Sequence, residues 1–167
     1  SAVRLQFARE IVETYRPTVI KGNISECKAF YGLTSYAHGV DAASDDQEDV
    51  YQSVTWLKEL ALHTGCIVVC SGKMDIITDG EQAVIIRNGC EMMGVVTGTG
   101  CMLNVAIATF LASFEPFEAC LKATCYYEVA AEKTKANGPG TFHMHFMDEI
   151  YQLTEEDEAF FKTEVVR

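Results

Sequence analysis

A run of five apolar residues from Cys66 to Cys70, Cys-Ile-Val-Val-Cys, places the strongest constraint on how this chain can fold. A strand with this sequence has no polar face, so both of its faces must be covered, as they are in parallel sheets between layers of helices. A β-branched run at Thr18–Ile20 predicts a second strand, and segments 75–79 and 82–87 predict a hairpin about Asp79-Gly80. We therefore expect an α/β fold with a mainly parallel central sheet.

Helical patterns alternate with these strands. Val3, Phe7 and Ile11 recur at helical spacing up to Tyr15, and Pro17 then ends the pattern. Longer helices are expected at about 46–63, 101–113 and 116–136. A last helical region is expected from about Thr141, restarting after Thr154 and ending in an acidic tail. The 167 residues suit a single α/β domain over 1–167. Only about four strands are visible, fewer than a doubly wound sheet normally has.

Charge and cysteine usage exclude several classes of protein. The chain has 24 acidic and 13 basic residues, a formal net charge of −11, which disfavours nucleic acid and anionic membranes as partners. The seven cysteines are odd in number, and several lie in apolar runs, which fits a reducing cytoplasm better than a disulfide framework. The charged first residues do not resemble a signal peptide, and the apolar stretch 95–112 is interrupted by Thr97–Gly100.

The most informative segment is Thr97-Gly-Thr-Gly-Cys101. Gly98 and Gly100 allow the backbone to approach a ligand closely, and the helix that follows offers unpaired N–H groups that bind phosphate or a developing anion. Cys101 falls in the first turn of that helix, where thiols ionise more readily than free ones. A glycine-rich turn with a buried cysteine explains the same pattern equally well, because short glycine loops are weak evidence.

A second polar segment, Lys21 to Glu26, directly follows a predicted strand. Asn23 and Glu26 could hold a hydrated Mg²⁺, which takes few protein ligands. The same spacing is that of a helix capping box, which geometry alone favours. Lys21 alone is more typical of a solvated surface lysine than of a phosphate ligand, and Ser71 lies at the end of a strand, where α/β sheets bind ligands.

Two further groups of polar residues receive no catalytic role. Asp75, Asp79 and Gly80 are most simply hairpin residues. His143 and His145 share one face and could bind a metal, but without a third ligand a structural or surface role is favoured.

Taken in order, five stretches of the chain resemble hydroxyethylthiazole kinase, a thiamin-salvage family of the ribokinase-like superfamily. They are Pro17–Glu26, Gly39-Val-Asp41, Ser71–Asp75 with Thr78-Asp-Gly80, Val96–Leu103 and Gly138–Phe142. The Thr-Gly-Thr-Gly-Cys loop is the most specific of them, because most ribokinase-like enzymes carry aspartate where this family has cysteine. The resemblance implies ATP-dependent, Mg²⁺-assisted phosphorylation of the primary alcohol of 4-methyl-5-(2-hydroxyethyl)thiazole.

The resemblance also implies roles for individual residues. Gly98, Thr99 and Gly100 look like the anion hole, Gly98 like a substrate contact, and Cys101 like the catalytic residue that faces the substrate hydroxyl. The remaining matches are the ATP contacts Lys21 and Ser71 and the metal-associated pair Asn23 and Glu26. The family usually has arginine at the position of Lys21 and threonine at that of Ser71. Lysine offers a phosphate a point charge in place of the two-pronged contact of arginine, whereas serine keeps the hydroxyl of threonine.

Two expectations concern the whole protein. Family members are longer, so the chain is expected to match the C-terminal part of the family's length and to lack the N-terminal strands of a three-layer ribokinase-like fold. The resemblance further suggests a cytoplasmic homotrimer with sites between subunits. Alternatives are another ribokinase-like kinase, such as one for hydroxymethylpyrimidine, or a non-catalytic binder of nucleotide or thiazole.

Overall fold

The computed structural model describes residues 2–32 and 49–167. The stretch Gly39-Val-Asp41 lies outside these residues. The chain divides into two compact units, one formed by Ser1–Ile85 with Val165–Arg167 and the other by Ile86–Glu164. The expectation of one α/β domain over residues 1–167 stays a prediction.

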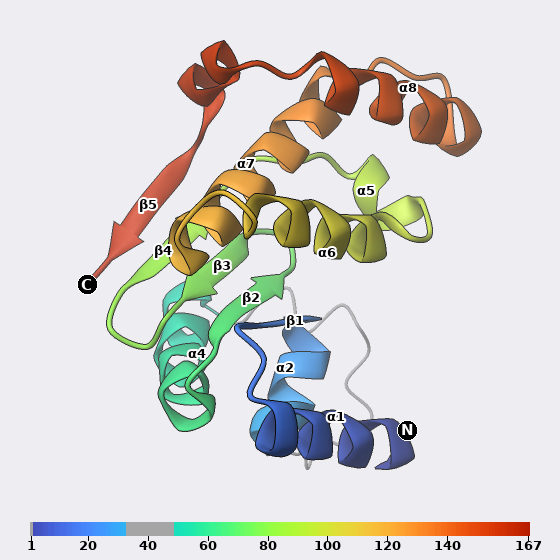
Figure 1. Ribbon diagram of the computed structural model, residues 1–167. Coiled ribbons are helices and arrows are strands. Elements are labelled where there is room, and N and C mark those ends of the chain that lie inside the picture. The colour runs from blue at the N-terminus through green and yellow to red at the C-terminus, as the bar shows by residue number, and fades with distance from the viewer. Residues whose placement is uncertain (1, 33–48) are drawn as a thin grey trace. The chain divides into compact units, whose positions relative to one another are not determined.

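Helices and strands alternate along most of the chain, as expected (Figure 1). In order they are α1 (Ala2–Tyr15), β1 (Val19–Asn23), α2 (Ile24–Tyr31), α4 (Val50–Thr64), β2 (Ile67–Ser71), β3 (Asp75–Thr78), β4 (Ala83–Ile86), α5 (Met92–Val95), α6 (Thr99–Phe110), α7 (Pro116–Lys133), α8 (Pro139–Gln152), the 3-10 helix η1 (Glu155–Phe160) and β5 (Thr163–Val166).

The strands form a five-stranded sheet with the order β1-β2-β3-β4-β5. β1 and β2 are parallel, with Lys21 paired to Val69 and Asn23 to Ser71. β2 and β3 are antiparallel, because only a short loop joins them. The sheet is therefore parallel in its first part and mixed overall, and the predicted strands at 75–79 and 82–87 are neighbours in it.

The strand predicted from the apolar run is the centre of the first unit's core. Val68, Val69 and Cys70 are 0% exposed. Strands β1 and β3 pair with its two edges, and the helix α4 contributes Leu57, which is also fully buried, to the same hydrophobic cluster. Burial on this scale stabilises each side chain by about 1.5–3 kcal/mol. The absence of a polar face in the sequence is thus explained by burial.

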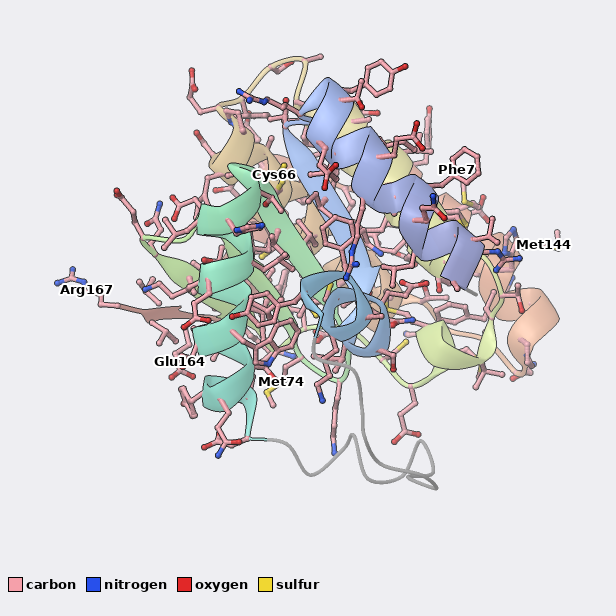
Figure 2. The ribbon with its side chains drawn as sticks, turned by 90° about the horizontal axis from the view of Figure 1, so that it is seen from below. Phe7, Cys66, Met74, Met144, Glu164 and Arg167 are labelled. Atoms are coloured by element: carbon pink, nitrogen blue, oxygen red, sulfur yellow. The ribbon has the colours of Figure 1, made fainter. Side chains whose placement is uncertain are left out.

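Helix α1 forms where the apolar spacing predicts it, but its apolar stripe is exposed. None of its described residues is buried, and Val3, Phe7 and Ile11 are all exposed. Phe7 is 61% exposed and points outward from the helix in Figure 2. Among the described helices, none combines the length and the apolarity needed to cross a membrane.

The second unit is built on α7, whose buried face carries ten residues. Tyr127 of α7 packs edge-on against Phe146 of α8, with 4.8 Å between ring centroids, and Phe146 stacks on Phe142. Leu103 and Ile107 supply the buried side of α6.

The C-terminal segment contains the helical restart expected after Thr154, but a strand forms where the acidic tail was expected. After α8 the chain forms η1, capped by Thr154 and Asp157, and then the strand β5. Arg87 donates its backbone N–H to the carbonyl of Lys162 and pairs its guanidinium with Glu164. Arg87 lies far from the tail in the sequence, so these contacts, and the strand, cannot be predicted from the acidic residues of the tail.

Candidate active site

The Thr97–Cys101 segment forms the beginning of α6. Gly98 is the N-cap residue with φ of 100°, a left-handed conformation that glycine adopts without strain. Its carbonyl accepts the N–H of Met102 at 2.9 Å. The first N–H groups of a helix have no partner within the helix, so those of Thr99, Gly100 and Cys101 can bind an anion.

Cys101 lies in the first turn of α6 and its side chain is exposed. All seven cysteines are free thiols, five of them are buried, and Cys90 is half-buried. The alternative of a buried structural cysteine at this position is therefore wrong. The exposed thiol stands two residues after Thr99 in a turn that can receive a phosphate.

The turn before α6 is held by hydrogen bonds to Thr99. Its hydroxyl donates to the carbonyl of Met93 at 2.9 Å and lies 3.3 Å from that of Val96. The carbonyl of Thr99 accepts the hydroxyl of Tyr127, from α7, at 2.8 Å. The sequence analysis did not single out Tyr127, because nothing in the neighbouring sequence of α7 relates it to a segment 28 residues earlier.

Lys21 and Ser71 meet at the carboxyl ends of the parallel strands β1 and β2. The ammonium Nζ of Lys21 lies 3.5 Å from Ser71 Oγ, and the Ser71 hydroxyl is 3.4 Å from the carbonyl of Gly22. Both side chains are half-buried. The pair offers one positive charge and one hydroxyl at the sheet edge where ligands of α/β proteins bind.

Asn23 and Glu26 form the capping box that the spacing predicts. Asn23 Oδ1 accepts the backbone N–H of Glu26 at 2.8 Å, and Glu26 Oε2 accepts that of Asn23 at 2.9 Å. Each of these oxygens has a second lone pair, so the turn can also hold a hydrated cation through a few contacts. No cluster of three or more His, Cys, Asp or Glu side chains occurs among residues 2–32 and 49–167. One amide oxygen and one carboxylate oxygen are a donor set that suits a cation which keeps most of its water.

Asp75 has a structural function in the loop after β2. Its Oδ1 accepts the backbone N–H of Gly72 at 2.9 Å, and the carboxylate is buried. This bond fixes the Ser71–Asp75 loop and thereby the strand end that carries Ser71. His143 and His145 are both exposed on α8, and His145 Nδ1 lies 2.7 Å from the carbonyl of Lys135, in keeping with a surface role.

The predicted site residues thus form two groups. Lys21, Asn23, Glu26 and Ser71 belong to the first unit, where the ends of β1 and β2 bring them together. Gly98 to Cys101 belong to the second unit, at the beginning of α6. Each group taken by itself can contribute to phosphate binding: the first offers a cation and polar oxygens, and the second offers backbone N–H donors with a thiol.

Sequence comparison relates the chain to one family. The model of the hydroxyethylthiazole kinase family matches residues 1–156. Hydroxyethylthiazole kinase 2 of Clostridium botulinum (strain Langeland) is 35% identical over 160 residues, which cover 93% of this chain and 60% of that protein. Hydroxyethylthiazole kinase of Arabidopsis thaliana is 38% identical over 159 residues, covering 93% of this chain and 56% of the relative. The chain therefore spans about 60% of the length of such relatives.

Structural comparison supports the same relationship. The hydroxyethylthiazole kinase protein from Pyrococcus horikoshii OT3 superposes with a TM-score of 0.86 at 28% identity, covering 100% of this chain and 61% of that one. Pyridoxal kinase from Staphylococcus aureus, in complex with AMP-PCP and pyridoxal, gives a TM-score of 0.57 at 17% identity and shows a shared fold only. The expected ribokinase-like α/β fold is confirmed.

The conformation of Gly98 generates a testable prediction. No atom lies within 4 Å of the position that a Cβ on Gly98 would occupy, so only backbone strain opposes a side chain there. We expect Gly98→Ala to lower the free energy of unfolding, measured by urea denaturation, by about 1–2 kcal/mol. Gly94→Ala is the matched control, since it also has open space but no positive φ, and it should leave stability equal or slightly raised. Equal effects of the two substitutions would contradict the strain at Gly98.

Proposed function

Because the chain belongs to the hydroxyethylthiazole kinase family, we propose that it carries out the transfer of the γ-phosphoryl group of ATP to the primary alcohol of 4-methyl-5-(2-hydroxyethyl)thiazole, a step of thiamin salvage. The observation that carries the proposal is the turn Gly98–Cys101, where backbone N–H donors and an exposed thiol lie together at the start of α6. In the transfer, the alcohol oxygen bonds to phosphorus, the bond to the ADP oxygen breaks, and the alcohol proton leaves.

The N–H groups of α6 would supply much of the catalysis. Phosphoryl transfer requires alignment of the two oxygens and stabilisation of the charge on the moving group, with little covalent chemistry by the protein. Fixed N–H donors do this without reorganisation during the reaction. They also allow an acidic chain to bind a polyanion, since a helix N-terminus carries partial positive charge whatever the net charge of the protein.

Cys101 would act on the substrate side of the turn. In the proposed reaction the Cys101 thiolate would accept the alcohol proton as a general base and become the thiol, or the thiol would only orient the hydroxyl. Gly98 would contact the substrate, because a residue without a side chain leaves open space at the cap of the helix. The base function is favoured, although a loose transition state does not strictly require it.

Lys21 and Ser71 would contact ATP, and Asn23 and Glu26 would hold Mg²⁺ through its water shell. When bound, Mg²⁺ neutralises charge on the phosphates. Lys21 contributes a point charge where an arginine would offer a fork, so it can neutralise a phosphate oxygen but fixes its orientation less. The Ser71 hydroxyl keeps the polar contact that threonine supplies in the family.

The cellular location and the oligomeric state of the protein are also part of the proposal. Seven free thiols are compatible with the cytoplasm, where disulfides are rare. A homotrimer with sites between subunits is what the family resemblance suggests. Two rival functions remain: a kinase for another small alcohol, such as hydroxymethylpyrimidine, and a binder of nucleotide or thiazole without catalysis.

A substrate panel tests the proposed function. The purified chain would be incubated with ATP, Mg²⁺ and in turn hydroxyethylthiazole, hydroxymethylpyrimidine, pyridoxal or no acceptor, with ADP and phosphorylated product measured. We expect phosphorylated product from the thiazole alone. Turnover of the pyrimidine or pyridoxal in its place would support the first rival. ATP binding without turnover of any acceptor would support the second.

The function of Cys101 predicts a particular kinetic change. We expect Cys101→Ala to lower kcat by about 10²–10⁴-fold if the thiol is a general base, and by less if it only positions the alcohol. The Kd of ATP should change little, because the thiol would face the alcohol. Cys90→Ala is the control, since this half-buried thiol lies outside the turn before α6 and donates to the carbonyl of Ala131. An unchanged kcat would remove Cys101 from the mechanism.

The two functions of Glu26 can be separated by Glu26→Gln. Glutamine keeps an oxygen that can accept the Asn23 N–H, so the capping box survives and the melting temperature should hardly change. The loss of charge should raise the Mg²⁺ concentration needed for half-maximal activity. A control variant, Glu13→Gln, removes one charge from the exposed helix α1. An identical Mg²⁺ requirement in wild type and Glu26→Gln would leave Glu26 with the cap function only.

A further inference from the structure

We propose that Tyr127 of α7 is a positioning residue for the phosphoryl-binding turn, and that its hydroxyl orients the peptide group between Thr99 and Gly100. The inference rests on the proposed function of that turn and adds a residue from a different helix. Neither the sequence pattern nor the family resemblance singled out Tyr127.

Tyr127 binds one end of the peptide group between Thr99 and Gly100, and the other end is a candidate phosphate donor. The Tyr127 hydroxyl donates to the carbonyl oxygen of Thr99 at 2.8 Å. That carbonyl belongs to the same planar unit as the N–H of Gly100, and the two groups point in opposite directions along it. A hydrogen bond that fixes the carbonyl from the α7 side therefore also fixes the direction of the Gly100 N–H at the open end of α6.

The same hydrogen bond strengthens Gly100 as a donor. Hydrogen bonds in series polarise one another, by about 10–30% per bond, so a carbonyl that accepts a hydrogen bond from a phenol makes the N–H of its own peptide more positive. Tyr127 is only 3% exposed, and burial raises the pKa of its phenol above the ordinary value. The hydroxyl thus stays protonated and remains a donor over the whole working pH range.

Packing holds Tyr127 in the orientation that this contact needs. Its ring lies edge-on against Phe146, which in turn stacks on Phe142, so α8 fixes the ring from the side. The hydroxyl of Thr99 binds the carbonyl of Met93, which anchors the peptide at a second point. Gly98 and Gly100 leave the turn with little conformational restraint of its own, so these side chains supply the rigidity that an anion site requires.

The neighbouring residue, Tyr126, supplies a matched control. It lies on the same helix, and its hydroxyl donates to Glu158 at 3.0 Å instead of to α6. Burial and the bond to Glu158 raise its pKa to about 12, so it too is a protonated phenol. Tyr126→Phe thus removes one hydroxyl from α7 and leaves the Thr99–Gly100 peptide untouched.

The first experiment observes Gly100 directly. Selective ¹⁵N-glycine labelling reduces the amide spectrum to the 12 glycines of the chain, and loss of a signal in Gly100→Ala assigns Gly100. We expect Tyr127→Phe to shift the Gly100 signal more than that of any other glycine, and Tyr126→Phe to leave it in place. Should Tyr127→Phe fail to fold, site-specific 3-fluorotyrosine at position 127 keeps the hydroxyl, makes it a stronger donor and should shift the signal in the opposite direction. A Gly100 signal that keeps its position when residue 127 is changed to phenylalanine or 3-fluorotyrosine would overturn the proposal.

The second experiment measures the consequence for the anion. In wild type, Mg-ATP or tripolyphosphate should shift the Gly100 signal, and Tyr127→Phe should reduce that shift. In the kinase assay Tyr127→Phe should lower kcat about tenfold while the KM for ATP changes less than twofold, less than the 10²–10³-fold loss typical of removing such a donor entirely. A phosphate response and kcat equal to those of Tyr126→Phe would overturn the positioning function.

Failure of the proposed kinase function gives a different pattern. Wild type would then lack turnover with the thiazole alcohol. The dependence of the Gly100 signal and of its tripolyphosphate response on Tyr127 would nevertheless persist, which would support Tyr127 as the positioning residue of an anion site that serves another reaction.

Discussion

The burial of strand β2 on both faces is the constraint from which the first unit is built. Val68, Val69 and Cys70 expose no surface, so helices must cover the strand and neighbours must pair with both of its edges. The parallel partner β1 brings its own carboxyl end to the same edge, which is why Lys21 and Ser71 meet although they are 50 residues apart. Lys21 and Ser71 thus come together at the strand ends because the apolar interior of β2 has to be buried beside a parallel neighbour.

How far the sequence predicts this structure depends on whether an element is determined locally. The apolar run, the hairpin about Asp79-Gly80 and the capping box of Asn23 and Glu26 are local patterns, and the structure contains all three. The strand β5 was missed because its neighbour in the sheet, β4, lies far away in the sequence. The contacts of Arg87 with Lys162 and Glu164 accompany this pairing. Tyr127 was missed for the same reason, since its function depends on a contact with Thr99 across two helices. Patterns formed by neighbouring residues can be predicted from a sequence, whereas contacts between distant segments are seen only in the three-dimensional structure.

The capping box shows that a structural explanation and a functional one need not compete. Glu26 Oε2 binds the Asn23 N–H, which satisfies a donor that α2 would otherwise leave open. The carboxylate keeps further lone pairs in this contact. A cap therefore holds the charge in a fixed position at the end of β1, and this is also what a weakly coordinated, hydrated cation needs.

The position of the Lys21 ammonium is best understood together with Ser71. An ammonium group has three donors, and one of them is directed at Ser71 Oγ at the long distance of 3.5 Å. The Ser71 hydroxyl in turn has the Gly22 carbonyl at 3.4 Å. Both contacts are weak by the usual geometric criteria, so a phosphate oxygen can replace either of them at small energetic loss. Lys21 and Ser71 can therefore exchange an internal contact for one with an anionic ligand, which is what the proposed contact with ATP requires.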